Sequence, residues 1–318
     1  MKFKIGTYTK KNSQGIYVGE FKDNKISIDL WNQADNPTYL DEFEDQVFSV
    51  VKDGDKGGVA YFYKGELINQ VTEVGAPPCY VSYDRKNQLV YSANYHGGRI
   101  NTYAIENGKL VDKEKFSYAE GSKAHYVVYS EELDEVVVCN LGNDEVYFYR
   151  VNQQKLSLAH TYKAAKGSGP RHVVVHPKSH LVYIFTELSS EVIVLKRTET
   201  STEVLQIIST LEDKNAQRWG AAIRLSPDGE YLYVSNRGHD SITVFKVNDI
   251  YLSWVENVPS LGVQPRDFNI SPCGHYLFVA NLDSNNLAVY DRDVKTGKLS
   301  VRLKDVEAFE PVCILFEE

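Results

Sequence analysis

The sequence repeats with a period of about 46 residues, and this repeat constrains the fold more than any other feature. Each unit begins at a proline or small residue that is followed by an apolar run. These seven anchor residues are Pro37, Pro78, Ala124, Pro170, Gly220, Pro265 and Pro311. A repeat of this length determines the whole architecture, so it is interpreted before any local motif.

The spacing inside each unit is constant, although the spacing between units varies. Sixteen residues after each of the first six anchors stands a short polar residue: Asp53, Asn94, Asn140, Thr186, Asn236 and Asn281. In the unit that begins at Pro170 we expect four strands, at 173–175, 181–185, 191–195 and 204–209. Four strands in about 45 residues are typical of a propeller blade. The sequence therefore predicts an all-β, seven-bladed β-propeller with four-stranded antiparallel blades.

The two ends of the chain complement each other. The last anchor is followed by a single strand, 312–316, whereas residues 5–9, 15–21 and 26–31 resemble the second, third and fourth strands of a blade. We expect both termini to build the seventh blade, which removes two free sheet edges. An open solenoid would need polar capping units, and two domains would need a linker. Neither feature is present, so residues 1–318 are predicted to form a single propeller domain.

Composition excludes several classes of partner. With 35 Lys and Arg against 43 Asp and Glu, the net charge is -8, which would not attract nucleic acid or an anionic membrane. No apolar run is long enough for a signal peptide or a membrane span, so we expect a cytoplasmic protein. The cysteines lack metal-ligand spacing, and no metal, cofactor or disulfide is expected. They are Cys79, Cys139, Cys273 and Cys313.

Departures from the repeat indicate where a site lies, because equivalent positions in a propeller should carry equivalent structural residues. Directly after the short polar residue, two adjacent units carry opposite charges, Glu187 and Arg237. One or two residues after an anchor stand four further polar side chains: His125, Arg171, His172 and Arg266. Since the first strand of a blade is innermost, we expect all six side chains to converge at one mouth of the central channel.

Each of these residues also has a purely structural interpretation. Glu187 and Arg237 could form only an ion pair between blades, and Arg171 and Arg266 could bind backbone carbonyls. His172 alone could be a buried histidine of the core. Taken together, however, they favour hydrolysis of an anionic ester, in which a carboxylate or imidazole activates water and guanidinium groups bind the oxyanion or the anionic group. No Gly-x-Ser-x-Gly motif and no glycine-rich phosphate loop is present.

At these residues the sequence resembles the lactonase family of seven-bladed propellers, which includes bacterial propeller-type 6-phosphogluconolactonases and fungal carboxy-muconate lactonizing enzymes. The resembling motifs extend from end to end of the chain. They include Gly6-Thr7-Tyr8-Thr9, Ala93-Asn94-Tyr95-His96-Gly97-Gly98, Gly169-Pro170-Arg171-His172, Ser235-Asn236-Arg237-Gly238 and Gln264-Pro265-Arg266-Asp267-Phe268.

The resemblance implies a lactonase site. It implies catalytic roles for His172, Glu187, Arg237 and Arg266. We further expect substrate contacts from Arg171, His125, Lys123 and His96. One motif departs from the family: members often have His-x-His where this chain has Lys123-Ala124-His125. A lysine there could bind an anion, but it could not act as an imidazole base.

The function predicted from the sequence is hydrolysis of a sugar-acid lactone, with 6-phosphogluconolactone as the first candidate. Water activated by His172 or Glu187 would attack the carbonyl, and the partner would be a small anionic lactone, without a metal or cofactor. Two alternatives remain. One is a non-catalytic propeller that binds a small anion or a peptide, and the other is a cycloisomerase of a muconate-like diacid.

Overall fold

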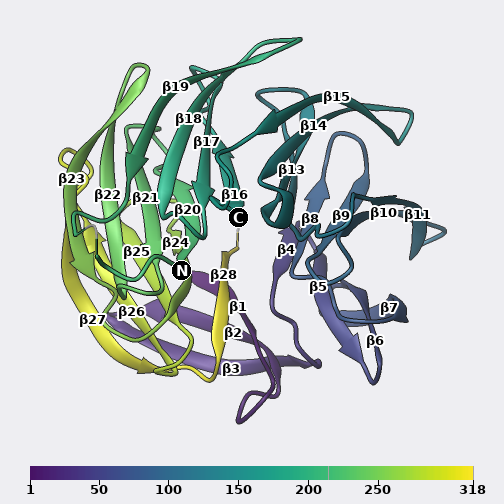
Figure 1. The fold of residues 1–318 in the computed structure, drawn as a ribbon. Coiled ribbons are helices and arrows are strands. Elements are labelled where there is room, and N and C mark those ends of the chain that lie inside the picture. Colours follow the sequence, from purple (N-terminus) through teal and green to yellow (C-terminus); the bar gives the residue numbers. More distant parts are fainter. Residues whose placement is uncertain (214, 318) are drawn as a thin grey trace.

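The computed structural model describes residues 1–213 and 215–317, and its strands form seven four-stranded antiparallel sheets arranged in a ring (Figure 1). In the described part of the chain the only helical segment is a single 3-10 turn, Leu141–Asn143. Within that same part, no helix is long and apolar enough to cross a membrane. The predicted all-β, seven-bladed propeller is confirmed.

Each blade contributes one strand to the channel wall and places three more progressively further out. The innermost strands are β4 (Leu40–Phe43), β8 (Tyr80–Asp84), β12 (Ala124–Ser130), β16 (Pro170–Val175), β20 (Gly220–Leu225), β24 (Pro265–Ile270) and β28 (Pro311–Phe316). The second strands are β1 (Lys2–Thr7), β5 (Gln46–Asp53), β9 (Leu89–Asn94), β13 (Glu135–Asn140), β17 (Leu181–Thr186), β21 (Tyr231–Asn236) and β25 (Tyr276–Asn281).

The outer half of each blade is built from longer strands. The third strands are β2 (Gly15–Lys22), β6 (Lys56–Tyr63), β10 (Arg99–Glu106), β14 (Glu145–Asn152), β18 (Glu191–Arg197), β22 (Ser241–Asn248) and β26 (Asn286–Arg292). The outermost strands are β3 (Lys25–Gln33), β7 (Glu66–Val74), β11 (Lys109–Ser117), β15 (Lys155–Lys163), β19 (Thr202–Ser209), β23 (Tyr251–Pro259) and β27 (Leu299–Glu307).

Burial follows from the position of a strand within its blade. Every residue of β17 is buried, because neighbouring blades cover both faces of a second strand. The outermost strand β19 of the same blade leaves Val204 and Ile207 exposed. The four strands predicted after Pro170 are all present, and the short polar residues at the sixteenth position end the second strands, as Thr186 ends β17.

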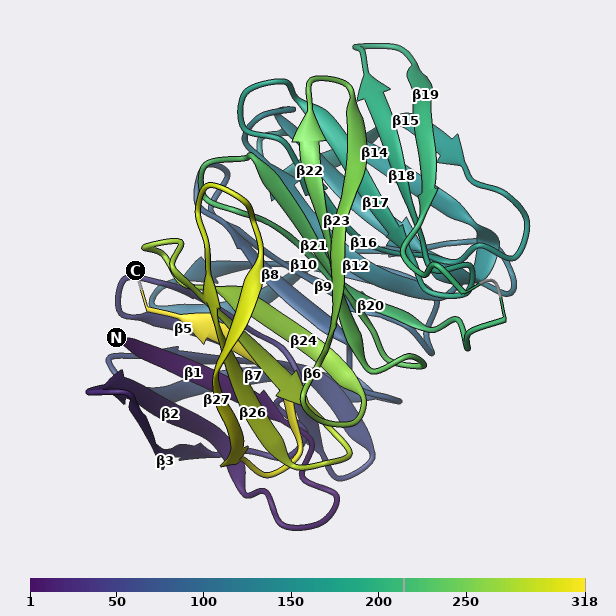
Figure 2. The ribbon, with the colours of Figure 1, turned by 90° about the vertical axis from the view of Figure 1, so that its left-hand side faces the viewer.

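The seventh blade is closed by both termini, as the sequence predicted. Strand β28 pairs antiparallel with β1, with Phe316 opposite Phe3 and Ile314 opposite Ile5. Figures 1 and 2 show the two strands side by side. Strand β1 begins three residues and ends two residues earlier than predicted, and beyond its end the backbone N–H of Tyr8 donates to the Glu310 carbonyl.

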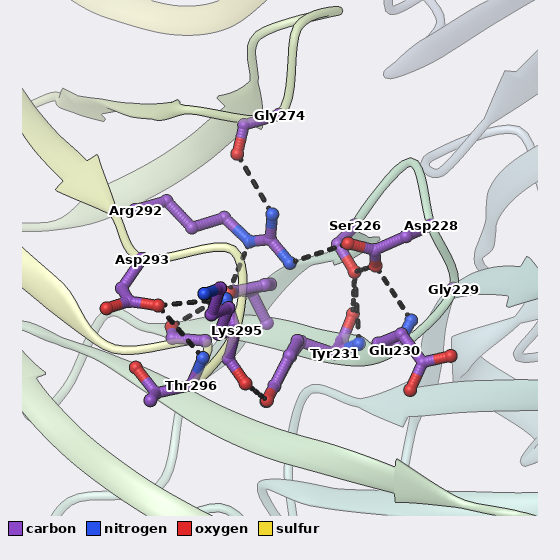
Figure 3. A network of polar contacts seen from close by, with 12 residues as sticks. Ser226, Asp228, Gly229, Glu230, Tyr231, Gly274, Arg292, Asp293, Lys295 and Thr296 are labelled. Atoms are coloured by element: carbon purple, nitrogen blue, oxygen red, sulfur yellow. Dashed lines mark hydrogen bonds and ion pairs between the residues drawn. The ribbon is translucent and has the colours of Figure 1, made fainter.

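Neighbouring blades are also joined by polar contacts away from the channel mouth (Figure 3). Arg292, from β26, donates to the carbonyl of Gly274 at 2.9 Å in its own blade. It reaches into the preceding blade to the Tyr233 hydroxyl at 2.7 Å and the Asp228 carboxylate at 3.3 Å. This buried guanidinium thus links two blades through three acceptors, and losing any of them would leave a buried donor unpaired.

Candidate active site

A cavity of about 390 Å³ opens at the end of the channel where the innermost strands begin. Its walls come from those strand starts and from the turns that follow the second strands. Seven of the eight predicted site residues line it: His96, His125, Arg171, His172, Glu187, Arg237 and Arg266. The expectation that these side chains converge at one mouth is therefore confirmed.

Glu187 lies at the centre of the polar network in this cavity. It follows the end of β17, and its Oε2 is 3.0 Å from Arg171 Nε and 2.8 Å from Arg237 Nη2. Its other oxygen, Oε1, accepts a hydrogen bond of 3.2 Å from Trp219 Nε1. Burial favours the neutral acid, but the charges of Arg171 and Arg237 outweigh it and lower the pKa of Glu187. Glu187 is therefore a carboxylate at neutral pH.

Arg237 is held from three directions. It follows the end of β21 and donates through Nη2 to the Gly220 carbonyl at 2.7 Å, while its guanidinium lies 4.2 Å from the centre of the Trp219 ring. Burial lowers the pKa of Arg237, but a guanidinium paired with a carboxylate keeps its proton. Its Nε is buried and has no hydrogen-bond partner among the described residues.

Arg171 connects the carboxylate to the channel interior. Its Nε pairs with Glu187. Its Nη1 donates to the Ala221 carbonyl at 2.8 Å and contacts His172 Nε2 at 3.0 Å. The possibility that Arg171 binds a backbone carbonyl is thus confirmed, together with its ion pair. Only 3% of its side chain is exposed, so its charge must be matched by these partners.

His172 lies among aromatic rings at the wall of the cavity. Its ring centre is 4.7 Å from that of Tyr126, 5.4 Å from that of His125 and 5.5 Å from that of Tyr80. Tyr80 and Tyr126 also line a second cavity, of about 250 Å³, deeper in the channel. The rings therefore separate the mouth from the rest of the channel.

Arg266 differs from the other two arginines. It is half-buried, its guanidinium lies 5.6 Å from the centre of the Tyr8 ring, and it has no hydrogen bond or ion pair within the described chain. The charged lining residues are Lys10, Arg171, Glu187, Arg237 and Arg266, a net charge of +3 when the histidines are neutral. Although the whole chain has a net charge of -8, the positive charge of this cavity attracts anions.

Lys123 is the predicted site residue that does not line the cavity. Its ammonium lies 5.2 Å from the centre of the Tyr95 ring, and Tyr95 in turn lines the cavity beside His96. Lys123 therefore lies next to a lining residue and does not itself form part of the cavity wall. Among the residues that the structure describes, no three His, Cys, Asp or Glu side chains are grouped so that they could hold a metal ion.

Twelve further residues line the cavity without having been predicted as site residues, among them Tyr8, Lys10 and Trp219. Tyr8 follows the end of β1 as Glu187 follows the end of β17, so it occupies the equivalent position in the closing blade. Trp219 directly precedes the anchor Gly220, and a large aromatic residue at that position was the available signal.

Fold and site together define a seven-bladed propeller whose channel mouth holds an ionised carboxylate among cations. The chain belongs to the lactonase family: residues 2–316 match the family model described as "Lactonase, 7-bladed beta-propeller". It is 36% identical to the 6-phosphogluconolactonase of Bacillus subtilis over 340 aligned positions, which cover 98% of this chain and 97% of the relative.

Solved structures show the same architecture. A Lactobacillus plantarum protein superposes with a TM-score of 0.96 at 36% identity, covering 100% of this chain and 99% of that one. The periplasmic gluconolactonase of Pseudomonas aeruginosa superposes with a TM-score of 0.89 at 27% identity, covering 99% and 98% of the two chains.

Proposed function

We propose that this chain hydrolyses a sugar-acid lactone, with 6-phosphogluconolactone as the first candidate. The main support is the contrast at the channel mouth between Glu187, fixed by two arginines, and Arg266, which is left without an ionic partner. A carboxylate held in one position can act as a base at the reacting centre, and a guanidinium without an ionic partner can bind an anionic group of the substrate. The name of the Bacillus subtilis relative supports the same substrate.

In the proposed reaction, a water molecule attacks the lactone carbonyl and transfers a proton to Glu187 Oε1. This oxygen is the better candidate base, because it accepts only from the neutral Trp219 indole whereas Oε2 faces two guanidinium groups. The carbonyl oxygen becomes an oxyanion, which Arg237 stabilises. The bond between the carbonyl carbon and the ring oxygen then breaks, and the ring oxygen takes up the proton. One lactone and one water give one hydroxy acid.

The other side chains have supporting roles in this proposal. Arg266 binds the anionic group of the substrate, and Lys10 and His96 extend the cavity wall around it. Arg171 holds Glu187, and His125 lines the floor. The proposal needs no metal. It also places the reaction in the cytoplasm, because a phosphorylated sugar does not cross a membrane unaided.

A panel of lactones tests this proposal. Purified protein in chelator would be assayed with 6-phosphogluconolactone, the unphosphorylated gluconolactone and an aliphatic lactone, each corrected for spontaneous hydrolysis. We expect the phosphorylated substrate to have the highest kcat/KM. Preference for an unphosphorylated lactone would contradict the assignment of the substrate. Thermal stabilisation by sugar phosphates without turnover of any lactone would contradict hydrolysis and favour a binding protein.

A further inference from the structure

His172 is tied to Arg171 by a contact whose direction is fixed by chemistry. The distance between Arg171 Nη1 and His172 Nε2 is 3.0 Å, which is a hydrogen bond. A guanidinium can only donate, so Nε2 must be the acceptor and must carry no proton. In the neutral ring the proton is therefore on Nδ1. The imidazole has a single lone pair able to accept a proton, and Arg171 already occupies it.

We propose that His172 is a positioning residue, whose Nε2 holds the Arg171 guanidinium against Glu187 while His172 itself takes no proton from water. The inference rests on the proposed lactone hydrolysis for its activity readout, but its structural readout is independent of any substrate. It assigns the base and its support to different residues, Glu187 and His172, which the sequence alone could not separate.

The geometry of Arg171 explains why this third contact matters. Its Nε donates to Glu187 Oε2 at 3.0 Å, and its Nη1 is shared between the Ala221 carbonyl and His172 Nε2. Ala221 belongs to the next blade, whereas His172 follows Arg171 on β16. Contacts at both Nε and Nη1 fix the orientation in which the planar guanidinium presents Nε to the carboxylate. Without the histidine acceptor, Nη1 is held by the Ala221 carbonyl alone.

The surroundings of His172 keep it neutral. The groups that face it are Arg171 on its own strand, His125 and Tyr126 on β12, Tyr80 on β8, Tyr39 before β4, Arg224 on β20 and Arg266 on β24. Burial, followed by the charge of Arg171, lowers the pKa of His172 well below its ordinary value. Its Nδ1 is buried and has no partner among the described residues, so it is not offered to solvent.

Three substitutions separate positioning from base catalysis. In His172→Gln the amide oxygen reaches about as far as Nε2 and can accept from Arg171, whereas the side chain in His172→Asn is one methylene shorter, and His172→Ala has no acceptor. We expect His172→Gln to keep kcat within about tenfold of the wild type, and the other two to lose about a hundredfold with little change in KM. Equal loss in all three folded variants would overturn the proposal.

A second measurement does not depend on activity and needs only His172→Gln to be folded. Wild-type protein with 15N-labelled histidine would be studied by NMR, with the His172 signals assigned by their absence from the His172→Gln spectrum. We expect a neutral ring protonated on Nδ1 that does not titrate from about pH 5.5 to 8.5. A proton on Nε2, or titration near the ordinary pKa, would overturn the inference. If the wild type hydrolyses no lactone, the proposed function fails while this test still stands.

Discussion

Glu187 and Arg237 come from neighbouring blades, and the nearest carboxylate oxygen and guanidinium nitrogen lie 2.8 Å apart with only 12% and 2% of the two side chains exposed. Two adjacent blades are thereby joined at the place where the proposed reaction occurs. One pair of side chains thus serves both the stability of the ring and the electrostatics of the cavity.

Replacing Arg237 should therefore affect stability and rate together. Arg237→Ala leaves the buried Glu187 carboxylate with one cation fewer, and removing one partner of a buried pair typically costs about 3 kcal/mol. We also expect most of the kcat to be lost, because the oxyanion loses its donor. Denaturant unfolding and steady-state kinetics on the same preparation measure both effects. A variant that kept full activity would show that Arg237 is only structural.

The variant Arg266→Ala is the matched comparison for Arg237→Ala, since both remove an arginine from the same cavity. Because Arg266 has no hydrogen bond or ion pair within the described chain, its removal should change the free energy of unfolding by no more than about 0.5 kcal/mol. We expect KM for a phosphorylated lactone to rise by about tenfold or more, since a charge-assisted contact to the substrate is lost. The unphosphorylated lactone should be much less affected. An equal effect on both substrates would argue against phosphate recognition by Arg266.

The pH dependence distinguishes Glu187 from histidine as the base. The pKa of Glu187 is lowered, so it remains a carboxylate until the pH falls below its usual value of about 4.3. A base must be deprotonated to act, so kcat/KM for the unphosphorylated lactone, which has no ionising phosphate, should stay level from about pH 7 to about pH 5 and fall only in stronger acid. Initial rates corrected for the spontaneous reaction measure this. A tenfold fall per pH unit beginning near pH 6.5 would indicate a histidine base.

Closure of the ring predicts a strong effect of a small truncation. Deleting residues 311–318 removes β28, which pairs with β1 and carries Phe316 into contact with Phe3 and Phe278. Its loss exposes a sheet edge and part of the core. We expect the melting temperature to fall sharply, measured by calorimetry. The single substitution Glu317→Ala, which removes only a partly exposed partner of Lys4, is the control and should shift it little. An unchanged melt of the truncated chain would contradict closure by both termini.

The ring, its closure and the position of the site were predictable because the repeat makes equivalent positions comparable. Glu187 and Arg237 stood out since their sister positions carry uncharged residues. Tyr8 could not be predicted in this way, because the closing blade is split between the termini and its second strand has no anchor sixteen residues before its end.

Other features depend on contacts that a one-dimensional pattern does not encode. Trp219 belongs to the connection 210–219, where the distance between anchors is longest. Lys123 was expected at the cavity but lies over the Tyr95 ring. The sharing of Glu187 between Arg171 and Arg237, and the acceptor role of His172 Nε2, follow only from side-chain geometry.

The central claim is that Glu187 in this cavity catalyses lactone hydrolysis. The most direct measurement compares initial rates of 6-phosphogluconolactone hydrolysis by the wild type and Glu187→Gln at neutral pH in chelator, each corrected for spontaneous opening. The account predicts a wild-type rate far above the spontaneous one and a loss of at least about a hundredfold in a folded Glu187→Gln. A wild type no faster than the spontaneous reaction, or a Glu187→Gln as active as the wild type, would contradict it.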